Sequence, residues 1–376
     1  MHSISPESQL ITRQSRFMNA IQVAGFDAFA LNAGPTLSYL TGLHFHLSER
    51  PVIGIFSPGN QPAIFLPELE RRKIENLQFK VNVFPYGEDP LSWGIKLSGA
   101  VEAYNLEGRK IGIEPRRFRV LELRLLETAI PSAQILSGEE CVARLRMHKD
   151  QTELAAMRQA ITIAQNALTA IMPSIKPGMT ERQLASTLTL ELLRNGSDPE
   201  IPFAPIIASG PNSANPHAVP SDRILQTGDL LIIDWGASVG GYISDLTRTF
   251  VLGDPEPEFS QIARIVLAAN TAARQQAKPG LPAGHLDRAA RQVIEKAGYG
   301  EFFTHRTGHG LGLEAHEEPY IRGDNPLLLA AGMTFTIEPG IYLPGRGGVR
   351  IEDNLVITES GSETLSDFPR ELGVLE

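Results

Sequence analysis

The sequence has a single cysteine, Cys141, among its 376 residues, so an intrachain disulfide is excluded and a reducing compartment is expected. No stretch approaches the ~18 consecutive apolar residues that a membrane-spanning helix needs. The first seven residues lack the basic and apolar regions of a signal peptide. Together these absences predict a cytoplasmic protein with no membrane contact.

The chain also lacks any run of lysine or arginine. Its 34 basic residues stand against 43 acidic residues, which gives a net charge of −9. Nucleic acids and anionic membranes attract proteins with an excess of positive charge, so neither is an expected partner. Hydrophobic residues make up 42% of the chain, which is enough for two domains that each bury a core.

The first part of the chain alternates short apolar runs with helical patterns, which predicts a small α/β domain. A second domain begins before Asp150, because Asp150 and Glu153 approximate the capping box of a helix whose apolar residues recur every three or four positions. The predicted domains are residues 1–145 and 146–376. In the first domain we expect strands at 27–31, 52–56, 63–66, 81–84 and 110–113, and helices at 93–104 and 118–128.

The second domain contains an internal repeat. The tripeptide Lys-Pro-Gly at 176–178 recurs at 278–280, an offset of 102 residues. A glycine that ends the next helix, and a glycine six residues before an acid, recur in the same order. Each half therefore consists of a helix, a turn, a second helix and a hairpin with two acids, which predicts a pseudo-twofold domain. The remaining matched positions are Gly196 with Gly298, Gly228 with Gly332, and Asp234 with Glu338.

Four acidic residues lie at the ends of apolar runs in this domain. Asp234 ends a run that predicts a buried strand entering a turn. Asp245 lies beyond the turn glycines 240–241, and a hairpin folded about them pairs residues whose numbers sum to 479. Asp234 is therefore expected to face Asp245 at about 5 Å. Glu338 and Glu352 are expected to form a second pair of this kind.

Together with the imidazole of His309, these four carboxylates form a ligand set suited to hard or borderline divalent cations such as Mn²⁺, Co²⁺ or Zn²⁺. Carboxylates that face each other across a hairpin can hold two metal ions about 3.5–4 Å apart. The alternative is a pair of solvated hairpins with exposed acids, but unpaired acids at the ends of buried runs are costly. The predicted metal ligands are Asp234, Asp245, His309, Glu338 and Glu352.

Four of the nine histidines have unusual surroundings. His305 and His309 lie among glycines, where the backbone can approach a ligand closely. His316 follows in the same segment, and His217 lies in a loop without hydrophobic periodicity, as functional residues often do. A lone histidine is more often structural, and we interpret the other five in that way: His2, His44, His46, His148 and His285.

The motifs resemble a known family. The order Asp-Asp-His-Glu-Glu, the segment HRTGHGLGLEAHEEP and the phrases IIDWG, YISDLTRTF, TIEPGIY and VRIEDN are similar to those of the methionine aminopeptidase, aminopeptidase P and prolidase group. The resemblance is strong over residues 150–370, and the N-terminal part resembles the creatinase-type N-domain of aminopeptidase P and prolidase. It implies an α+β pita-bread catalytic domain behind a smaller α/β N-domain.

The resemblance also implies roles for individual residues. The five predicted ligands would hold two divalent ions, Mn²⁺ above all, with Co²⁺ or Zn²⁺ as alternatives. Glu338 would accept a proton from the attacking water, and His217 and His316 would contact substrate or transfer protons. His305 would line the pocket, and Arg350 would orient a carboxylate or a ligand. Members with this N-domain usually form homodimers in which the N-domain of one subunit helps to wall the partner's cleft. The resemblance therefore implies a homodimer here, with residues 32–50 as the stretch that would reach the partner.

The implied activity is that of an exopeptidase that cleaves the bond between an N-terminal residue and proline, with short proline-containing peptides as substrates. The separate N-domain favours an Xaa-Pro aminopeptidase or dipeptidase over the methionine aminopeptidases. Tyr342 and Phe203 are candidates for the wall of a proline slot. Three alternatives remain: a metal-free creatinase-like C–N hydrolase, a metal-dependent hydrolase of ectoine derivatives, and a non-catalytic binding member. The intact ligand set disfavours the first, and the absence of a basic tail disfavours the last.

Overall fold

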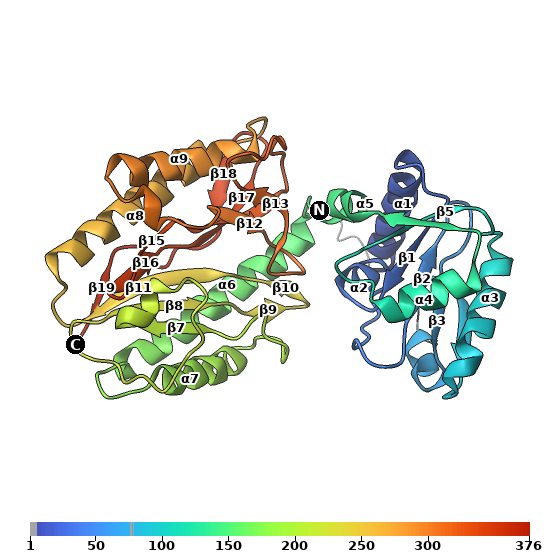
Figure 1. The fold of residues 1–376 in the computed structure, drawn as a ribbon, viewed down its shortest axis with the longest axis horizontal. Helices are drawn as coiled ribbons and strands as arrows, with labels where there is room; N and C mark the ends of the chain where they lie inside the picture. The colour runs from blue at the N-terminus through green and yellow to red at the C-terminus, as the bar shows by residue number, and fades with distance from the viewer. Residues whose placement is uncertain (1–5, 76, 78) are drawn as a thin grey trace. The chain divides into compact units, whose positions relative to one another are not determined.

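The structure is a computed structural model, and it describes residues 6–75, 77 and 79–376 (Figure 1). Its internal contacts divide the chain into two compact units, Met1–Arg146 and Met147–Glu376. The sequence places the domain boundary one residue earlier, between residues 145 and 146. Residues 1–5, which carry most of the stretch without a signal-peptide pattern, lie outside the described residues. No described helix is long and apolar enough to span a membrane.

The N-terminal unit is a mixed six-stranded sheet with the order β4-β3-β2-β1-β5-β6 and helices packed around it. All five expected strands and both expected helices are confirmed, with ends displaced by two residues at most. The apolar runs did not reveal four further elements, α1, α2, β6 and α5, because these are short or carry mostly polar residues. The strands are β1 (Ala28–Asn32), β2 (Ile53–Phe56), β3 (Ala63–Pro67), β4 (Asn82–Tyr86), β5 (Lys110–Ile113) and β6 (Gln134–Ser137), and the helices are α1 (Pro6–Val23), α2 (Pro35–Thr41), α3 (Trp93–Ala103), α4 (Val120–Ala129) and α5 (Glu139–Arg146).

The C-terminal unit has a four-stranded sheet with the order β19-β11-β8-β7 and a five-stranded sheet with the order β13-β12-β14-β17-β18. Two long helices lie on each side of the strands: α6 (Gln151–Ile171) and α7 (Glu181–Arg194) on one side, α8 (Pro257–Gln276) and α9 (Ala283–Lys296) on the other (Figure 1). The first sheet contains β7 (Ile206–Ser209), β8 (Leu230–Trp235), β11 (Leu246–Leu252) and β19 (Gly373–Leu375). The second contains β12 (Gly308–Gly310), β13 (Glu317–Ile321), β14 (Thr334–Ile337), β17 (Asp353–Ile357) and β18 (Ser362–Thr364), and two hairpins complete the unit: β9 (Ser238–Val239) with β10 (Tyr242–Ile243), and β15 (Gly340–Leu343) with β16 (Gly347–Arg350).

The predicted internal repeat is present in the structure. In the first half, Gly178 has a φ of 98° and its N–H donates to the carbonyl of Leu225 at 3.0 Å. In the second half, Gly280 has a φ of 82° and donates to Leu329 at 2.8 Å. A positive φ suits glycine because it has no Cβ, so the two Lys-Pro-Gly turns make the same structure. This confirms the pseudo-twofold pita-bread architecture.

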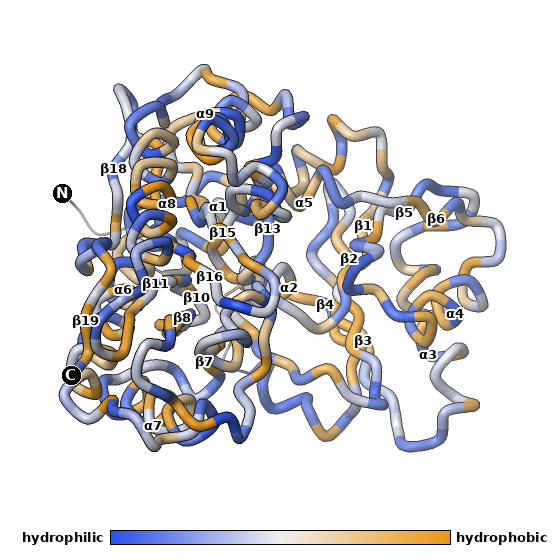
Figure 2. The backbone as a smooth tube through the Cα atoms, turned by 60° about the vertical axis from the view of Figure 1, so that its left-hand side comes forward, coloured by the Kyte–Doolittle hydropathy of each residue, from blue (hydrophilic) through white to orange (hydrophobic). Residues whose placement is uncertain are grey.

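The core of this unit forms where α6 and α7 cover the first sheet. Trp235, at the end of β8, is fully buried, and its ring N–H donates to the carbonyl of Ala164 in α6 at 2.7 Å. Helix α6 begins with the expected capping box of Asp150 and Glu153. Hydrophobic and hydrophilic residues alternate along α8 (Figure 2), as they do in a helix that buries one face. The acids of the second domain therefore lie in strands or directly beside their ends, and a packed apolar layer holds the first of these sheets.

The register of the first acid-bearing hairpin differs from the sequence prediction. Strands β8 and β11 pair residues whose numbers sum to 481, so Asp234 lies opposite Thr247 and not opposite Asp245. The turn glycines were identified correctly. However, β9 and β10 also pair residues whose numbers sum to 481, so each residue lies opposite a partner two positions later than predicted. Asp245 therefore lies diagonally across from Asp234 on the same face, because side chains two residues apart point the same way.

Candidate active site

Thr247 of β11 connects the two sheets at the centre of the domain. It pairs with Asp234 of β8 on one side and makes an isolated bridge to Glu352 on the other. Its hydroxyl donates to the Glu352 carboxylate at 2.6 Å. Asp234 belongs to the first sheet and Glu352 directly precedes β17 of the second. The junction therefore brings acids from both halves of the repeat into one place.

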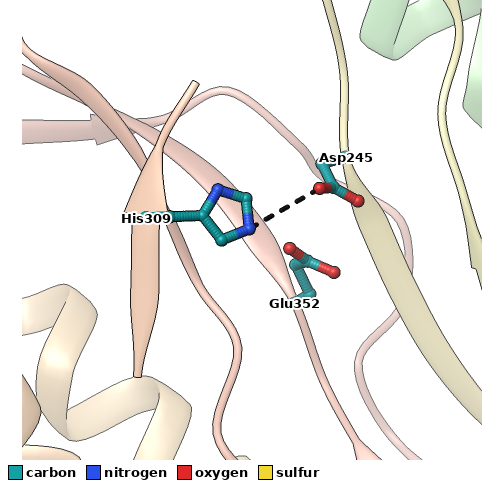
Figure 3. A group of neighbouring side chains, drawn as sticks. All are labelled: Asp245, His309 and Glu352. Atoms are coloured by element: carbon teal, nitrogen blue, oxygen red, sulfur yellow. Dashed lines mark ion pairs between the residues drawn. The ribbon is translucent and has the colours of Figure 1, made fainter. Parts of the chain in front are cut away.

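Three of the predicted ligands point into one small space (Figure 3). Asp245, His309 and Glu352 each offer a ligand atom, and these atoms all lie within 4.8 Å of one another. All three side chains are buried. They come from three different places: the residue before β11, the strand β12 and the residue before β17. A centre assembled in this way exists only in the folded domain.

The remaining two predicted ligands border the same space. Nε2 of His309 lies 3.7 Å from Oδ2 of Asp245 and 3.3 Å from Oε1 of Glu338. The β14–β17 register pairs Ile337 with Asp353, and its extension by one residue sets Glu338 across from Glu352, as the sequence predicted. Asp234 acts electrostatically on both Asp245 and Glu352. The structure thus brings all five residues together.

The electrostatics of this centre call for positive charge. Burial raises the pKa of Asp245 well above its ordinary value, and the neighbouring Glu352, Asp234 and Glu338 raise it further. Burial, followed by Glu338 and Asp234, does the same to Glu352. Burial also raises the pKa of Glu338 to about 7. Carboxylates whose charges oppose one another in a buried space are stabilised as anions by cations bound between them.

Hydrogen bonding points to the same conclusion. Nδ1 of His309 lies 3.1 Å from the carbonyl of Gly310, and a carbonyl can only accept, so the proton sits on Nδ1. Burial keeps the pKa of His309 well below its usual range, so the ring is neutral and Nε2 presents a lone pair to Asp245 and Glu338. Oδ1 of Asp234 is buried without a hydrogen-bond partner in the described part of the chain. Lone pairs facing one another in this way fit divalent cations.

Arg350 holds the other oxygen of Asp234. Its guanidinium donates to Oδ2 of Asp234 at 2.6 Å, to the hydroxyl of Thr247 at 3.1 Å and to the hydroxyl of Tyr342 at 3.0 Å. All of these side chains are buried. The resemblance implied that Arg350 orients a carboxylate or a ligand, and in the structure Arg350 contacts the carboxylate of Asp234.

His305 lies behind Tyr342 in a directed chain of hydrogen bonds. Its Nδ1 lies 2.7 Å from the carbonyl of Arg306 and must donate, while burial and then Arg350 lower its pKa to about 4 and keep the ring neutral. Nε2 therefore accepts from the Tyr342 hydroxyl at 2.8 Å, and that oxygen accepts from Arg350. His305 thus contacts the residue that orients Arg350, whereas the sequence placed it in the pocket wall.

His217 and His316 lie at the open side of the centre. Both are exposed, in contrast to the buried His309. The ring of His316 packs edge-on against the ring of His309 with centroids 4.2 Å apart. His217 is close enough to influence the pKa of both His305 and His316. Two exposed imidazoles beside a buried acidic centre can exchange protons with a bound ligand.

Sequence reasoning missed two groups around this centre. Thr247 was not singled out, although it lies two residues after Asp245 and bonds to Glu352 and Arg350. Asp353 was also missed: it is fully buried, and although burial alone would raise its pKa, Arg248 and Arg370 hold that pKa below its usual value. Of the two proline-slot candidates, Tyr342 is buried and Phe203 is half-buried.

A buried set of acids with one imidazole, between the sheets of a pita-bread domain, defines a hydrolase of the metallopeptidase class. Residues 155–359 match Metallopeptidase family M24, and residues 13–148 match the Creatinase/Prolidase N-terminal domain. The chain belongs to metallopeptidase family M24.

Several known proteins are similar to it over nearly their full length. The dipeptidase of Pyrococcus horikoshii OT3 shares 39% identity with a TM-score of 0.91, covering 96% of this chain and 100% of its own. The prolidase of Thermococcus sibiricus shares 34% identity with a TM-score of 0.91, covering 99% and 100%. The Xaa-Pro dipeptidase of Lactobacillus delbrueckii subsp. lactis shares 33% identity, covering 96% of this chain and 98% of its own.

Proposed function

We propose that this protein is a metal-dependent dipeptidase that hydrolyses the bond between an N-terminal residue and proline. The observation that carries the proposal is the buried cluster of Asp245, His309 and Glu352. Glu338 and Asp234 border it, and Oδ1 of Asp234 has no partner among the described residues. Two divalent ions fit these donors, with Mn²⁺ the expected metal and Co²⁺ or Zn²⁺ as alternatives. The ligands would be Asp234, Asp245, His309, Glu338 and Glu352.

Bound ions of this kind polarise a peptide carbonyl and activate water. The protein's own part is to move protons. Of three of the proposed ligands, Glu338 is the most accessible: 15% of its side chain is exposed, against 8% for Asp245 and 11% for Asp234. Glu338 therefore suits the acceptance of a proton from water. His217 and His316 are exposed beside it and suit the protonation of the departing amine.

Arg306 supports a dipeptide substrate. Its guanidinium lies over the ring of Tyr320, 4.3 Å from the centroid. The same charge opposes the effect of burial on the pKa of Glu338, so it lies near the centre. Among the described residues Arg306 forms no ion pair, which leaves it able to bind the terminal carboxylate of a dipeptide. A longer peptide has no carboxylate at that distance from the scissile bond.

The assignment of proline rests on the relatives. Two of the similar proteins are a prolidase and an Xaa-Pro dipeptidase. A bond to proline has no amide hydrogen, so its site needs no acceptor there but does need a proton donor for the departing nitrogen. The exposed His217 meets that need.

We also propose that the protein is a cytoplasmic homodimer that binds neither nucleic acid nor membrane. The proposal is supported by the acidic balance of the chain and by the creatinase-type N-terminal unit. Light scattering tests it: a mass of about twice 41.0 kDa is expected, and a monomer would contradict it.

Three other functions on this fold are less well supported. A creatinase-like hydrolase without metal, or a binding protein without activity, has no use for four mutually repelling buried carboxylates. A metal-dependent hydrolase of another small C–N substrate, such as an ectoine derivative, would use the same centre. It is distinguished from a dipeptidase only by the substrate that it hydrolyses.

The deciding experiment compares Ala-Pro, Ala-Pro-Ala and Ala-Ala with protein that has been stripped by chelator and reloaded with Mn²⁺. We expect the highest kcat/KM with Ala-Pro and no turnover before reloading. Equal rates on Ala-Ala would indicate a broad dipeptidase, faster cleavage of Ala-Pro-Ala would indicate an aminopeptidase, and no turnover of any peptide would favour the small-molecule hydrolase. Full activity of the stripped protein would contradict the metal-dependent mechanism.

A further inference from the structure

A fully buried carboxylate at the start of α7 lies outside the acidic centre and takes no part in the proposed chemistry. Glu181, the first residue of that helix, has no exposed surface. Its Oε1 accepts from the backbone N–H and the hydroxyl of Ser209 at 2.7 and 2.8 Å. Its Oε2 accepts from the backbone N–H and the hydroxyl of Ser221 at 3.0 and 2.6 Å. The side-chain amide of Asn212 lies 3.1 Å from both oxygens.

These donors mark the two ends of one loop. Ser209 is the last residue of β7, Ser221 lies beyond the loop, and Asn212 belongs to the short 3₁₀ helix Gly210–Ala214 inside it. The loop between the two serines carries His217. One carboxylate therefore closes the base of the loop that presents the proposed proton donor.

Glu181 does not act as the cap of its own helix. Thr180 fills that position, and its hydroxyl accepts from the backbone N–H of Gln183 at 3.1 Å in a complete capping box. All the hydrogen bonds to the Glu181 carboxylate that the structure shows come from the loop and its ends. A buried carboxylate is costly unless it is fully hydrogen-bonded. These hydrogen bonds therefore stabilise both the buried carboxylate of Glu181 and the loop that supplies them.

The far side of the loop is tied to the active site. The guanidinium of Arg350 donates to the carbonyl of Pro216 at 3.2 Å, one residue before His217. The hydroxyl of Ser213 accepts from the backbone N–H of Gly348 at 2.9 Å. The loop is thus held at its base by Glu181 and near His217 by the residue that orients Asp234. A shift at the base would move His217 relative to the acidic centre.

The second half of the repeat holds its histidines in a similar way. Asp287 of α9 is buried, and its Oδ1 accepts from the backbone N–H and the hydroxyl of Thr307 at 3.0 and 2.8 Å. Thr307 lies between His305 and His309. Asp287 lies one helical turn further along its helix than Glu181. The two acids therefore make similar contacts but do not occupy equivalent positions in the repeat.

We propose that Glu181 is a positioning residue: by binding both ends of the 209–221 loop, it sets the place of His217 at the active site. The catalytic part of this inference rests on the role of His217 in the proposed function. The structural part, that Glu181 orders the loop, is independent of that role. The two parts can be tested separately.

The first measurement is hydrogen–deuterium exchange of the metal-loaded protein. In Glu181→Gln the carboxylate is lost while the side chain keeps its size, so faster exchange is expected across residues 210–220 and not across 305–312. Glu191→Gln on the same helix is the matched control, because within the described part of the chain the Glu191 carboxylate bonds only to Arg194 and Asn195 at the end of that helix. Unchanged exchange of the loop in a folded Glu181→Gln protein would overturn the inference.

The second measurement is kinetic. Glu181→Gln is expected to lower kcat by up to ~10²-fold, since displacement of a positioned group has effects of that size, with metal content unchanged. In a His217→Ala background the same substitution should have little further effect, because residues that act through one another are not additive. A full additional loss in that background would show that Glu181 does not act through His217.

A milder variant covers the case in which Glu181→Gln does not fold. Asn212→Ala removes the amide that bridges both oxygens and leaves both serines in place, so smaller changes of the same sign are expected in exchange and in kcat. Faster loop exchange with unchanged kcat would confirm that Glu181 orders the loop and would contradict the role of His217. Loss of metal in either variant would overturn the proposed separation of the loop from the metal ligands.

Discussion

Arg350 and Asp234 form a buried ion pair in which a guanidinium nitrogen lies 2.6 Å from Oδ2 of the carboxylate. The pair joins the β15–β16 hairpin to the first acid of the centre. Because Oδ2 is occupied, Oδ1 is the oxygen that remains, and it is buried with no partner among the described residues. Arg350 therefore decides which oxygen of Asp234 is available to a metal ion.

The first prediction concerns this pair. Arg350→Lys keeps the charge but cannot reach Asp234, Thr247 and Tyr342 at once. Disruption of a buried ion pair costs about 3–5 kcal/mol, so calorimetry should show a lower Tm and metal analysis a lower occupancy. Tyr342→Phe is the control for metal content, because it leaves Asp234 paired. It removes a hydrogen bond to the neutral His305, worth about 0.5–1.5 kcal/mol, and one to the charged Arg350, worth about 1.5–3 kcal/mol. Wild-type metal content in Arg350→Lys would contradict the orienting role.

The second prediction concerns pH and the metal-free protein. Burial raises the pKa of Asp245, Glu352 and Glu338 in the folded state, that of Glu338 from 4.5 to about 7. A group with a raised folded pKa favours the folded state while it is protonated, so this stability is lost as pH rises through the raised value. The Tm of the chelated protein should fall as pH increases from about 5 to 8.

Two controls test the origin of that slope. Asp245→Asn removes one of the repelling charges, so the metal-free Tm at neutral pH should rise while the increase in Tm on addition of Mn²⁺ is lost. In the wild type, Mn²⁺ should abolish the fall of Tm with pH. A metal-free Tm that rises over this range would contradict the assignment of mutual repulsion.

The third prediction separates the histidines by function. His309→Ala should lose both metal and activity, because its Nε2 faces the acids at 3.3 and 3.7 Å. His217→Ala and His316→Ala should keep the metal and lose about 10²–10⁴-fold in kcat, as expected for a lost general acid or oxyanion donor. Metal analysis beside steady-state kinetics makes the distinction. A His316→Ala protein that changed only in metal occupancy would move His316 into the ligand set.

The fourth prediction concerns Arg306 and substrate length. If its guanidinium binds the terminal carboxylate, Arg306→Leu should raise KM at least about tenfold for Ala-Pro, since a hydrogen bond to a charged group is worth about 1.5–3 kcal/mol. It should leave KM for Ala-Pro amide, which lacks that charge, nearly unchanged. Arg322→Leu is the control, as that arginine is exposed and pairs with Asp324. Equal losses on both substrates would assign Arg306 a structural role.

The local features of the fold were predictable because they depend on neighbours in sequence. Apolar runs identified the strands of the N-terminal sheet, and Asp150 with Glu153 marked the start of α6. The repeat was visible because both Lys-Pro-Gly turns need glycine at a positive φ. The register of β8 with β11 was not predictable from the turn residues, because the loop between them forms its own short hairpin, which keeps the number sum at 481.

By itself, the sequence determined the residue types of the site: four acids at the ends of apolar runs and a histidine among glycines, in an order that resembles one family. Only the tertiary structure decided how these residues meet. The bridge of Thr247 to Glu352 joins two sheets, the Arg350 pair selects an oxygen of Asp234, and Glu181 closes the loop around His217. The physical reason is that each of these contacts joins residues far apart in the chain, and their geometry follows from packing and from the need to satisfy buried charge, which no local pattern records.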